Sequence, residues 1–247
     1  MNENSISVIV PALNEEKNLE AAVAMVSEAV KKRFDEYEII IFNDGSSDRT
    51  GEVAEALAKR DKHLKVIHHK NSKCLGGVYK EGRALAKMNY LIFVNGKGDI
   101  PSESLDAILA QCGKADIIIP YTLNSKDRSI HRRVISQIFV RLLNTIFRLN
   151  LRYYNHSVLH KKEIVDSVDI FTNSYAFQAE ILIKLIKSGY SYIEVGISDK
   201  FEKGIKTKIF KLKNIISTGL FLINIISEIY FSKKYRNKRE SILDKVR

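Results

Sequence analysis

The chain has little of what marks several protein classes. It has two cysteines and three prolines among 247 residues, and Cys74 and Cys112 lack the spacing of a metal or redox site. This argues against a disulfide framework and favours a reduced, cytoplasmic setting. Repeats and low-complexity linkers are absent, and residues 1–5 do not start a basic segment with an apolar run behind it. We therefore expect a globular chain without a secretory signal.

Long apolar runs are also missing from the C-terminal region. The longest charge-free stretch there, residues 214–227, is 14 residues long and includes Asn224 and two serines. A membrane-spanning helix needs about 20 apolar residues. We therefore expect no membrane span in this region.

The composition is that of an ordinary globular protein, but its charge is unevenly distributed. The formal net charge is +11, of which +9 falls on residues 200–247 and +2 on residues 1–199. Such a basic end is typical of proteins that bind nucleic acid or anionic lipid, or it serves solubility. No nucleic-acid-binding motif accompanies the charge, so we expect no nucleic-acid partner.

Strand-like and helix-like segments alternate along the first hundred residues. Apolar, β-branched runs at 5–10, 38–42, 64–69 and 90–94 predict strands, with helices between them. Further strands are expected at 116–120 and 190–196, and helices near 102–112, 128–149 and 174–189. This alternation predicts an α/β fold with a mostly parallel sheet.

Two strands end in polar loops that start helices. The first loop contains Pro11, Asn14 and Glu15, and the second reads Asn43-Asp44-Gly45-Ser46-Ser47-Asp48. In an open α/β sheet, ligands bind in the crevice at the carboxyl ends of the strands, where Asp44 could accept hydrogen bonds from a ribose or a base. The alternative is an Asx-turn with a helix cap and no ligand.

Together the two loops resemble the nucleotide-sugar-binding half of family 2 glycosyltransferases, which have the GT-A fold. The family pattern is P-x-x-N-E followed by D-D-G-S-x-D, and Asn43 replaces the first Asp of the second motif. Residues 71–77 resemble a third, glycine-bearing family segment, for which a plain helix start is the alternative. The resemblance implies that the donor is bound by a set of seven residues: Pro11, Asn14, Glu15, Asp44, Gly76, Gly77 and Asn95.

The chain departs from the family where its members hold a metal. The family's D-x-D-x-Q ligands for Mg²⁺ or Mn²⁺ are replaced by Asn95, Lys97 and Asp99. Asn95 and Asp99 could still hold a metal, but Lys97 offers no oxygen ligand, which makes a metal cofactor doubtful. Either Lys97 itself offsets the charge of the diphosphate, or donor activation is lost and the domain only binds. We assign catalytic roles to Lys97, Asp99 and Gln178.

Several basic residues resemble the acceptor side of the polyprenyl-phosphate branch, the dolichyl-phosphate mannosyltransferase-like group. The expected phosphate ligands lie in two segments: Arg128, Arg132 and Arg133, and Lys206, Thr207 and Lys208. Arginine forks bind phosphate oxygens in a bidentate manner. A solvated basic helix face is the alternative.

Three side chains in the second half of the chain are harder to assign. Gln178 and Glu180 are about 200° apart on a helix, so only one of them faces a given pocket. We expect Gln178 to face the donor sugar or phosphate. For Glu180 two alternatives stay open: a solvated side chain, or a candidate base, as an acid here is in some relatives. His156 replaces a family glycine, and a structural role is favoured for it.

We divide the chain into a GT-A domain, residues 1–206, and a helical extension, residues 207–247. Apolar residues between 215 and 230 followed by basic residues 233–239 predict an amphipathic helix in the interface of an anionic membrane. The alternative is a helix that packs on its own domain or on a partner subunit, and homo-oligomers also stay open. We expect a peripheral protein on the cytoplasmic face of the membrane.

These features predict an inverting glycosyltransferase that moves a sugar from a nucleotide-sugar to a polyprenyl-phosphate-type lipid. The first alternative is a family 2 enzyme with another glycan acceptor. The second is a catalytically weakened binding subunit, because Asn43, Lys97 and His156 all depart from the family pattern.

Overall fold

The computed structural model describes residues 4–201, 212–232 and 235. A seven-stranded sheet forms its centre, in the order β3-β2-β1-β4-β6-β5-β7. The strands are β1 (Ser5–Ala12), β2 (Glu36–Asp44), β3 (Leu64–His69), β4 (Tyr90–Phe93), β5 (Ile117–Thr122), β6 (Leu159–Lys161) and β7 (Tyr192–Ile197). All pairs are parallel except β4–β6 and β5–β6, so β6 joins two parallel halves.

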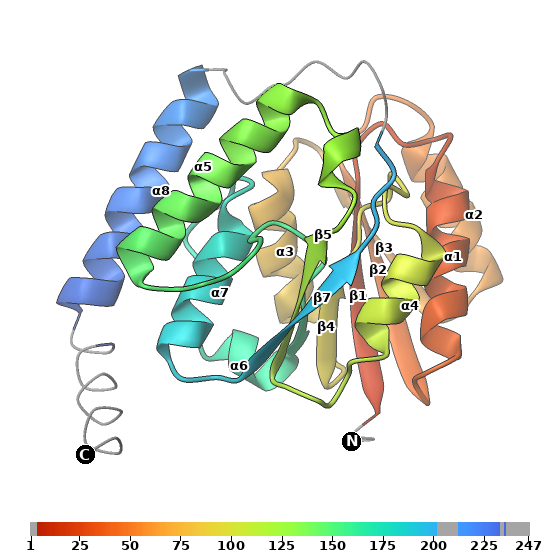
Figure 1. The fold of residues 1–247 in the computed structure, drawn as a ribbon. Helices are drawn as coiled ribbons and strands as arrows, with labels where there is room; N and C mark the ends of the chain where they lie inside the picture. Colours follow the sequence, from red (N-terminus) through yellow and green to blue (C-terminus); the bar gives the residue numbers. More distant parts are fainter. Residues whose placement is uncertain (1–3, 202–211, 233–234, 236–247) are drawn as a thin grey trace.

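Helices cover both faces of the sheet (Figure 1). They are α1 (Leu19–Lys31), α2 (Thr50–Arg60), α3 (Cys74–Leu85), α4 (Ser102–Leu109), α5 (Ile130–Phe147), α6 (Lys162–Asp166), α7 (Phe177–Lys187) and α8 (Leu212–Phe231), with a 3₁₀ turn, η1 (Ser125–Asp127). The strands alternate between two cores: Val8 and Val10 pack with α1 and α4, whereas Ile9 packs with α3 and α7. Alternation of this kind follows from the two-residue period of a strand.

The mostly parallel α/β fold is confirmed, and the predicted strands lie within a few residues of the observed ones. The strand β6 and the helix α6 were not predicted from the sequence. The strand β6 has three residues, too few to show a period, and its place is determined by antiparallel pairing with β4 and β5. At its centre, His160 pairs with Leu91 on one side and Ile117 on the other.

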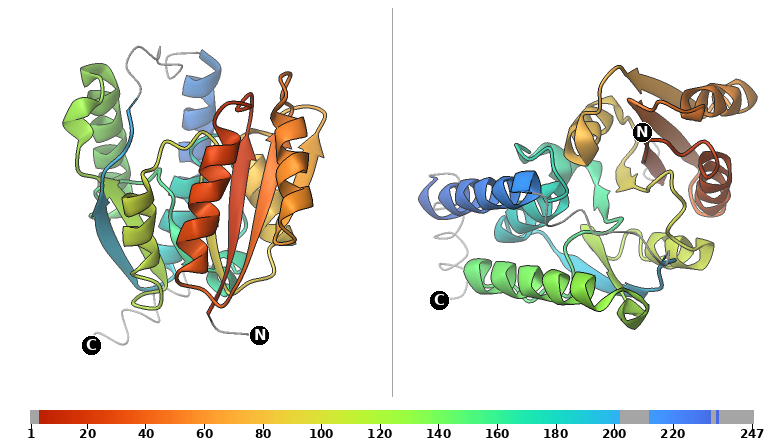
Figure 2. Two further views of the ribbon diagram at one scale, coloured as in Figure 1. Left: turned by 90° about the vertical axis from the view of Figure 1, so that its right-hand side faces the viewer. Right: turned by 90° about the horizontal axis from the view of Figure 1, so that it is seen from above.

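The helix α8 packs on the domain itself, beside α5 (Figure 2). It buries Phe221, Ile225 and Ile229 in the core that also contains α7, and the Tyr230 ring stacks on Phe147 with centroids 6.2 Å apart. Packing on its own domain is one of the two alternatives considered for this helix. The division at residue 207 lies outside the described residues and stays a prediction. None of the described helices is both long and apolar enough to span a bilayer.

Candidate active site

The loops that follow β1 and β2 are joined by hydrogen bonds. Asn14 N–H donates to Ser46 Oγ at 3.0 Å, Ser47 N–H donates to Asn14 Oδ1 at 2.9 Å, and Glu15 N–H donates to Thr50 Oγ1 at 2.8 Å. Asn14 has a φ of 59°, a left-handed conformation that asparagine tolerates better than most residues. The predicted donor residues Asn14 and Glu15 therefore also hold the two loops in one rigid corner.

Asp44, at the end of β2, is buried and surrounded by donors. Its carboxylate accepts hydrogen bonds from Ser72 Oγ at 2.6 Å and Lys73 N–H at 2.8 Å, and lies 2.7 Å from His69 Nδ1. Burial alone would raise the pKa of Asp44, but these hydrogen bonds outweigh it and lower the pKa below its ordinary value. Asp44 is thus held ionised, and it ties the β2 loop to the β3 loop.

Two of the glycines allow close backbone approach. A Cβ on Gly76 would lie 2.4 Å from Thr172 O, and Gly76 N–H donates to Asn173 O at 2.9 Å, so this glycine seats α3 against the loop before α7. Gly45 has a φ of +81°, and a Cβ there would lie 2.9 Å from Ser72 N. Packing therefore accounts for Gly76, and its role toward the donor stays a prediction, as does that of Gly77.

The loop after β4 carries Asn95, Lys97 and Asp99 along the same edge of the sheet. It is joined to the first loop because Gly96 N–H donates to Pro11 O at 3.0 Å. Asp99 is half-buried, and burial together with the nearby charge of Asp199 raises its pKa, while His156 and Lys97 act in the opposite direction. Four titratable side chains from three loops thus influence one another here.

Asp199, which the sequence analysis did not single out, connects this cluster to the far half of the sheet. It follows β7 and lies 2.9 Å from His156 Nε2, and Thr122 Oγ1 donates to it at 2.6 Å. The available signal was an acid three residues after a predicted strand, a pattern close to that of Asp44, which follows its predicted strand by two residues. The contact with Asp199 is consistent with a structural role for His156. The pair also lies close enough to Asp99 to change its pKa.

Arg128 is the predicted acceptor residue closest to this cluster. Its Nη1 donates to Tyr153 Oη at 3.1 Å, and its guanidinium lies 5.8 Å from the centre of the Phe201 ring. Its positive charge helps to lower the pKa of Asp199. Its Nε is buried and has no hydrogen-bond partner among the described residues.

The other predicted phosphate ligands are placed less directly. Arg132 and Arg133 lie in the first turn of α5, half-buried, four and five residues after Arg128. Lys206, Thr207 and Lys208 lie outside the described residues.

Of the two alternatives for Glu180, the solvated side chain is excluded. Glu180 is fully buried, accepts hydrogen bonds from Phe171 N–H and Thr172 N–H, and pairs with Lys184 at 2.8 Å. Lys184, also fully buried, pairs in addition with Glu228 of α8 at 2.6 Å. Gln178 is 2% exposed, and neither its oxygen nor its nitrogen has a partner among the described residues. It therefore keeps free hydrogen-bonding capacity, as its predicted role requires.

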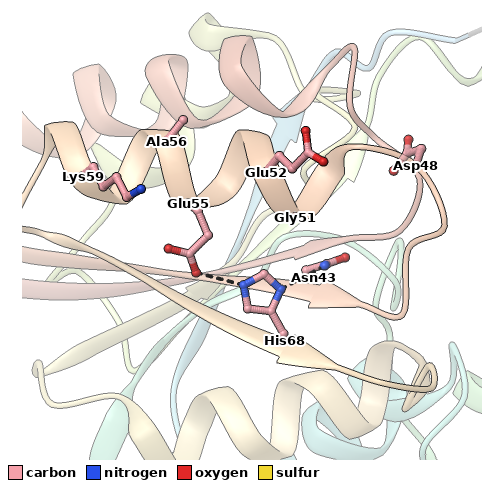
Figure 3. Close-up of a pocket in the computed structure, with 8 residues that line it drawn as sticks. All are labelled: Asn43, Asp48, Gly51, Glu52, Glu55, Ala56, Lys59 and His68. Atoms are coloured by element: carbon pink, nitrogen blue, oxygen red, sulfur yellow. Dashed lines mark hydrogen bonds and ion pairs between the residues drawn. The ribbon is translucent and has the colours of Figure 1, made fainter.

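A pocket of about 570 Å³ lies between α2 and β3 (Figure 3). Asn43 and Glu55 contact the two nitrogens of His68 within it, at 3.0 and 2.9 Å. Asp48, Glu52 and Glu55 line it against one lysine, Lys59, a balance that disfavours an anionic diphosphate. Asn43 therefore turns away from Asp44 and from the loop after β4.

The residues at the predicted metal position fit a divalent cation poorly. Asn95 offers one neutral oxygen, Asp99 has a raised pKa, and the residue between them is Lys97. Mg²⁺ and Mn²⁺ favour carboxylate and other oxygen ligands. Among the described residues, no three His, Cys, Asp or Glu side chains gather closely enough to hold a metal ion.

The fold and the joined loops at one sheet edge define a GT-A glycosyltransferase, and comparison with known proteins agrees. The model of the family "Glycosyl transferase family 2" matches residues 7–173. This chain belongs to that family.

Among curated relatives, the uncharacterized glycosyltransferase EpsJ of Bacillus subtilis is 33% identical over 46% of this chain and 32% of its own. The polyprenol monophosphomannose synthase of Mycolicibacterium smegmatis is 27% identical over 77% of this chain and 76% of its own. The chain spans between a third and a half of three of these relatives, the B. subtilis proteins EpsJ and EpsH and the Streptococcus pneumoniae protein GlyG.

Among solved structures, the glucosyl-3-phosphoglycerate synthase of Mycobacterium tuberculosis superimposes with a TM-score of 0.68 at 16% identity. The match covers 91% of this chain and 78% of that one, whose structure contains Mn²⁺, uridine diphosphate and phosphoglyceric acid. At this identity the likeness establishes the fold.

Proposed function

We propose that this enzyme transfers a sugar from a nucleotide-sugar to a polyprenyl-phosphate-type lipid, with inversion at the anomeric carbon. An acceptor phosphate oxygen forms the new bond to that carbon as the bond to the departing nucleoside diphosphate breaks. The observation that carries the proposal is Arg128 beside the Asp99–His156–Asp199 cluster, with a buried Nε that has no partner among the residues that the structure describes. A guanidinium with an unused donor suits a phosphate.

The donor is proposed to bind along the loops after β1, β2 and β4. These loops are held together by hydrogen bonds that Asn14 makes with Ser46 and Ser47, and by the pairs Glu15–Thr50 and Gly96–Pro11, which gives a preorganised edge. Preorganised groups lose little entropy when a ligand binds. Two structures of the M. tuberculosis synthase, each matched over 91% of this chain, contain uridine diphosphate. This supports a nucleotide-sugar donor.

Lys97 is proposed to take over part of the charge compensation that a metal supplies in solved relatives. Its position follows β4, where the resemblance expects a metal ligand, and its charge opposes the rise in the pKa of Asp99 that burial causes. Asp99 and Gln178 are proposed to contact the donor or the reacting groups. This predicts weak dependence on Mg²⁺ or Mn²⁺.

The polyprenol relative supports a lipid phosphate acceptor, because it matches over three quarters of both chains. A second candidate is a glycan hydroxyl. The observation that favours it is Asp99, a half-buried carboxyl group whose raised pKa makes it a better proton acceptor for a hydroxyl nucleophile. His156 is not free for this task, since its Nε2 faces Asp199 and its Nδ1 accepts from Ser157 N–H. A phosphate is already anionic and needs no such base.

A transfer assay separates these acceptors. Purified protein is incubated with UDP- and GDP-sugars, each with polyprenyl phosphate in detergent or with an oligosaccharide, and with either Mn²⁺ or EDTA. We expect sugar transfer to the phosphate with one nucleotide class, largely retained in EDTA. Transfer to the oligosaccharide alone would establish the second candidate, and complete loss in EDTA would refute the role of Lys97.

A further inference from the structure

One face of α5 presents apolar side chains to solvent. Ile130, Val134, Ile138 and Leu142 are exposed by 65, 45, 59 and 41%. They follow one another at intervals of four residues, so they share one side of the helix. An exposed apolar stripe of this length on a soluble domain marks a contact surface.

This stripe is separate from the face by which α5 packs on the domain. Leu143 and Phe147 are buried in the core, and Tyr230 of α8 stacks on Phe147 and donates to Ile146 O. The helix is therefore anchored without its outer apolar residues. The packing of the residues that the structure describes does not explain the exposure of these four side chains.

The charge around the stripe has a single sign. Residues 128–152 contain six arginines and no aspartate or glutamate. Arg141 and His131 lie on the exposed side of α5 itself. In contrast, α2 mixes Glu52 and Glu55 with Lys59 and Arg60, as an ordinary solvated helix does. Such a surface suits an anionic membrane, because the apolar side chains can contact the acyl chains while the arginines contact the anionic headgroups.

We propose that the exposed face of α5 binds an anionic lipid membrane. A second copy of the chain is a poorer occupant, because a symmetric contact would place the arginines of one α5 near those of the other. Arg128 lies two residues before the helix, so docking through α5 would bring the proposed phosphate-binding arginine to the headgroup layer. The biological reason for this docking rests on the proposed lipid acceptor, whereas the evidence for it is the exposed surface of α5.

The test is vesicle flotation of the full chain, with neutral phosphatidylcholine vesicles and with vesicles that also contain phosphatidylglycerol. We expect binding to be at least about 10-fold tighter to the anionic vesicles, and Ile138→Glu to weaken it about 10-fold. Leu142→Glu and Leu85→Glu form a matched pair, since both leucines are 41% exposed but only the first is on α5. Leu142→Glu should weaken binding and Leu85→Glu should not.

Equal flotation of the native chain and the α5 variants would overturn the inference, as would equal binding to both kinds of vesicle. So would light scattering that shows a dimer in the native chain and a monomer in Ile138→Glu, without lipid binding by either. Transfer to a short-chain, detergent-free prenyl phosphate is measured in parallel and should be retained by Ile138→Glu. If the native chain floats but transfers no sugar to any phosphate, the proposed function fails while the docking surface stands.

Discussion

The two halves of the sheet edge differ in how completely their polar groups are paired. On the donor edge, formed by the loops after β1, β2 and β3, Asn14, Asp44 and Thr50 make hydrogen bonds within the protein. On the acceptor edge, formed by the loops after β5 and β7 beside Asp99 of the β4 loop, the Nε of Arg128 has no partner among the described residues, and burial raises the pKa of Asp99. The hydrogen bonds of the first edge hold its loops in place. The second edge has a donor and a carboxyl group that a bound ligand could pair with.

The largest expected effect on stability is at the donor edge. Asp44→Ala removes the common acceptor of Ser72 Oγ, His69 and Lys73 N–H, and leaves these donors unpaired. We expect the free energy of unfolding to fall by about 3 kcal/mol in chemical denaturation. The control is Asp127→Ala on the exposed η1 turn, which should cost less than about 0.5 kcal/mol. Equal losses of stability in the two variants would show that Asp44 does not hold the donor-edge loops together.

Arg128→Gln is the corresponding change at the acceptor edge. It should lower kcat/KM for a polyprenyl phosphate about 100-fold, which corresponds to about 2.7 kcal/mol, because the phosphate loses its charged fork. Stability should change by less than about 1 kcal/mol, since the side chain makes one hydrogen bond, to Tyr153. Steady-state kinetics and denaturation check the two halves of this statement. A variant that unfolds easily while its folded fraction stays fully active would contradict it.

His160 tests the junction between the two halves. Burial lowers its pKa to about 3, whereas an unfolded histidine has a pKa near 6.5. Between about pH 6.5 and 3, the unfolded state therefore binds a proton that the folded state does not. The free energy of unfolding should fall by at most about 1.4 kcal/mol per pH unit as the pH is lowered.

The measurement is denaturation of the native chain and His160→Leu across this range. The difference between them isolates His160 from the carboxylates that titrate in the same range. Parallel pH profiles for the two proteins would show that His160 does not carry the effect.

The smallest expected effects come from two glycines and have opposite signs. Gly45→Ala places a Cβ at a φ of +81° and 2.9 Å from Ser72 N, so it should destabilise the donor edge by about 1–2 kcal/mol. Gly219→Ala in α8 meets no atom within 4 Å and should stabilise the protein by about 0.5–1 kcal/mol. Thermal unfolding of both variants measures the contrast. Stabilisation by Gly45→Ala would mean that the β2 loop is not held as described.

How far the sequence could predict this molecule depends on which interactions determine each feature. The strands β1 to β5 and β7 were predictable, because apolar β-branched runs and their polar ends are local signals. β6 was not, since three residues carry no period and long-range pairing determines them. The burial of Glu180 was left undecided because a helical wheel does not show which side of the helix faces the core. The later Lys184, four residues on, was the available hint of a buried pair.

The site divides in the same way. The donor loops were recognisable because each motif is contiguous, whereas the Asp99–His156–Asp199 cluster draws one residue from each of three segments. Only the sheet order, which places β7 beside β5 and β6 beside β4, brings these segments to one edge. The contact of Asp199 with His156 therefore could not be predicted from spacing along the chain.

The most direct test of the difference between the two edges is thermal unfolding of the native chain and of Arg128→Gln with two ligands in turn. Uridine or guanosine diphosphate probes the donor edge, and a short-chain prenyl phosphate probes the acceptor edge. A ligand at about 100 times its dissociation constant adds about 2.7 kcal/mol of stability. We predict that the variant keeps the stabilisation by nucleotide and loses that by prenyl phosphate. Equal stabilisation of both proteins by the prenyl phosphate would contradict the account.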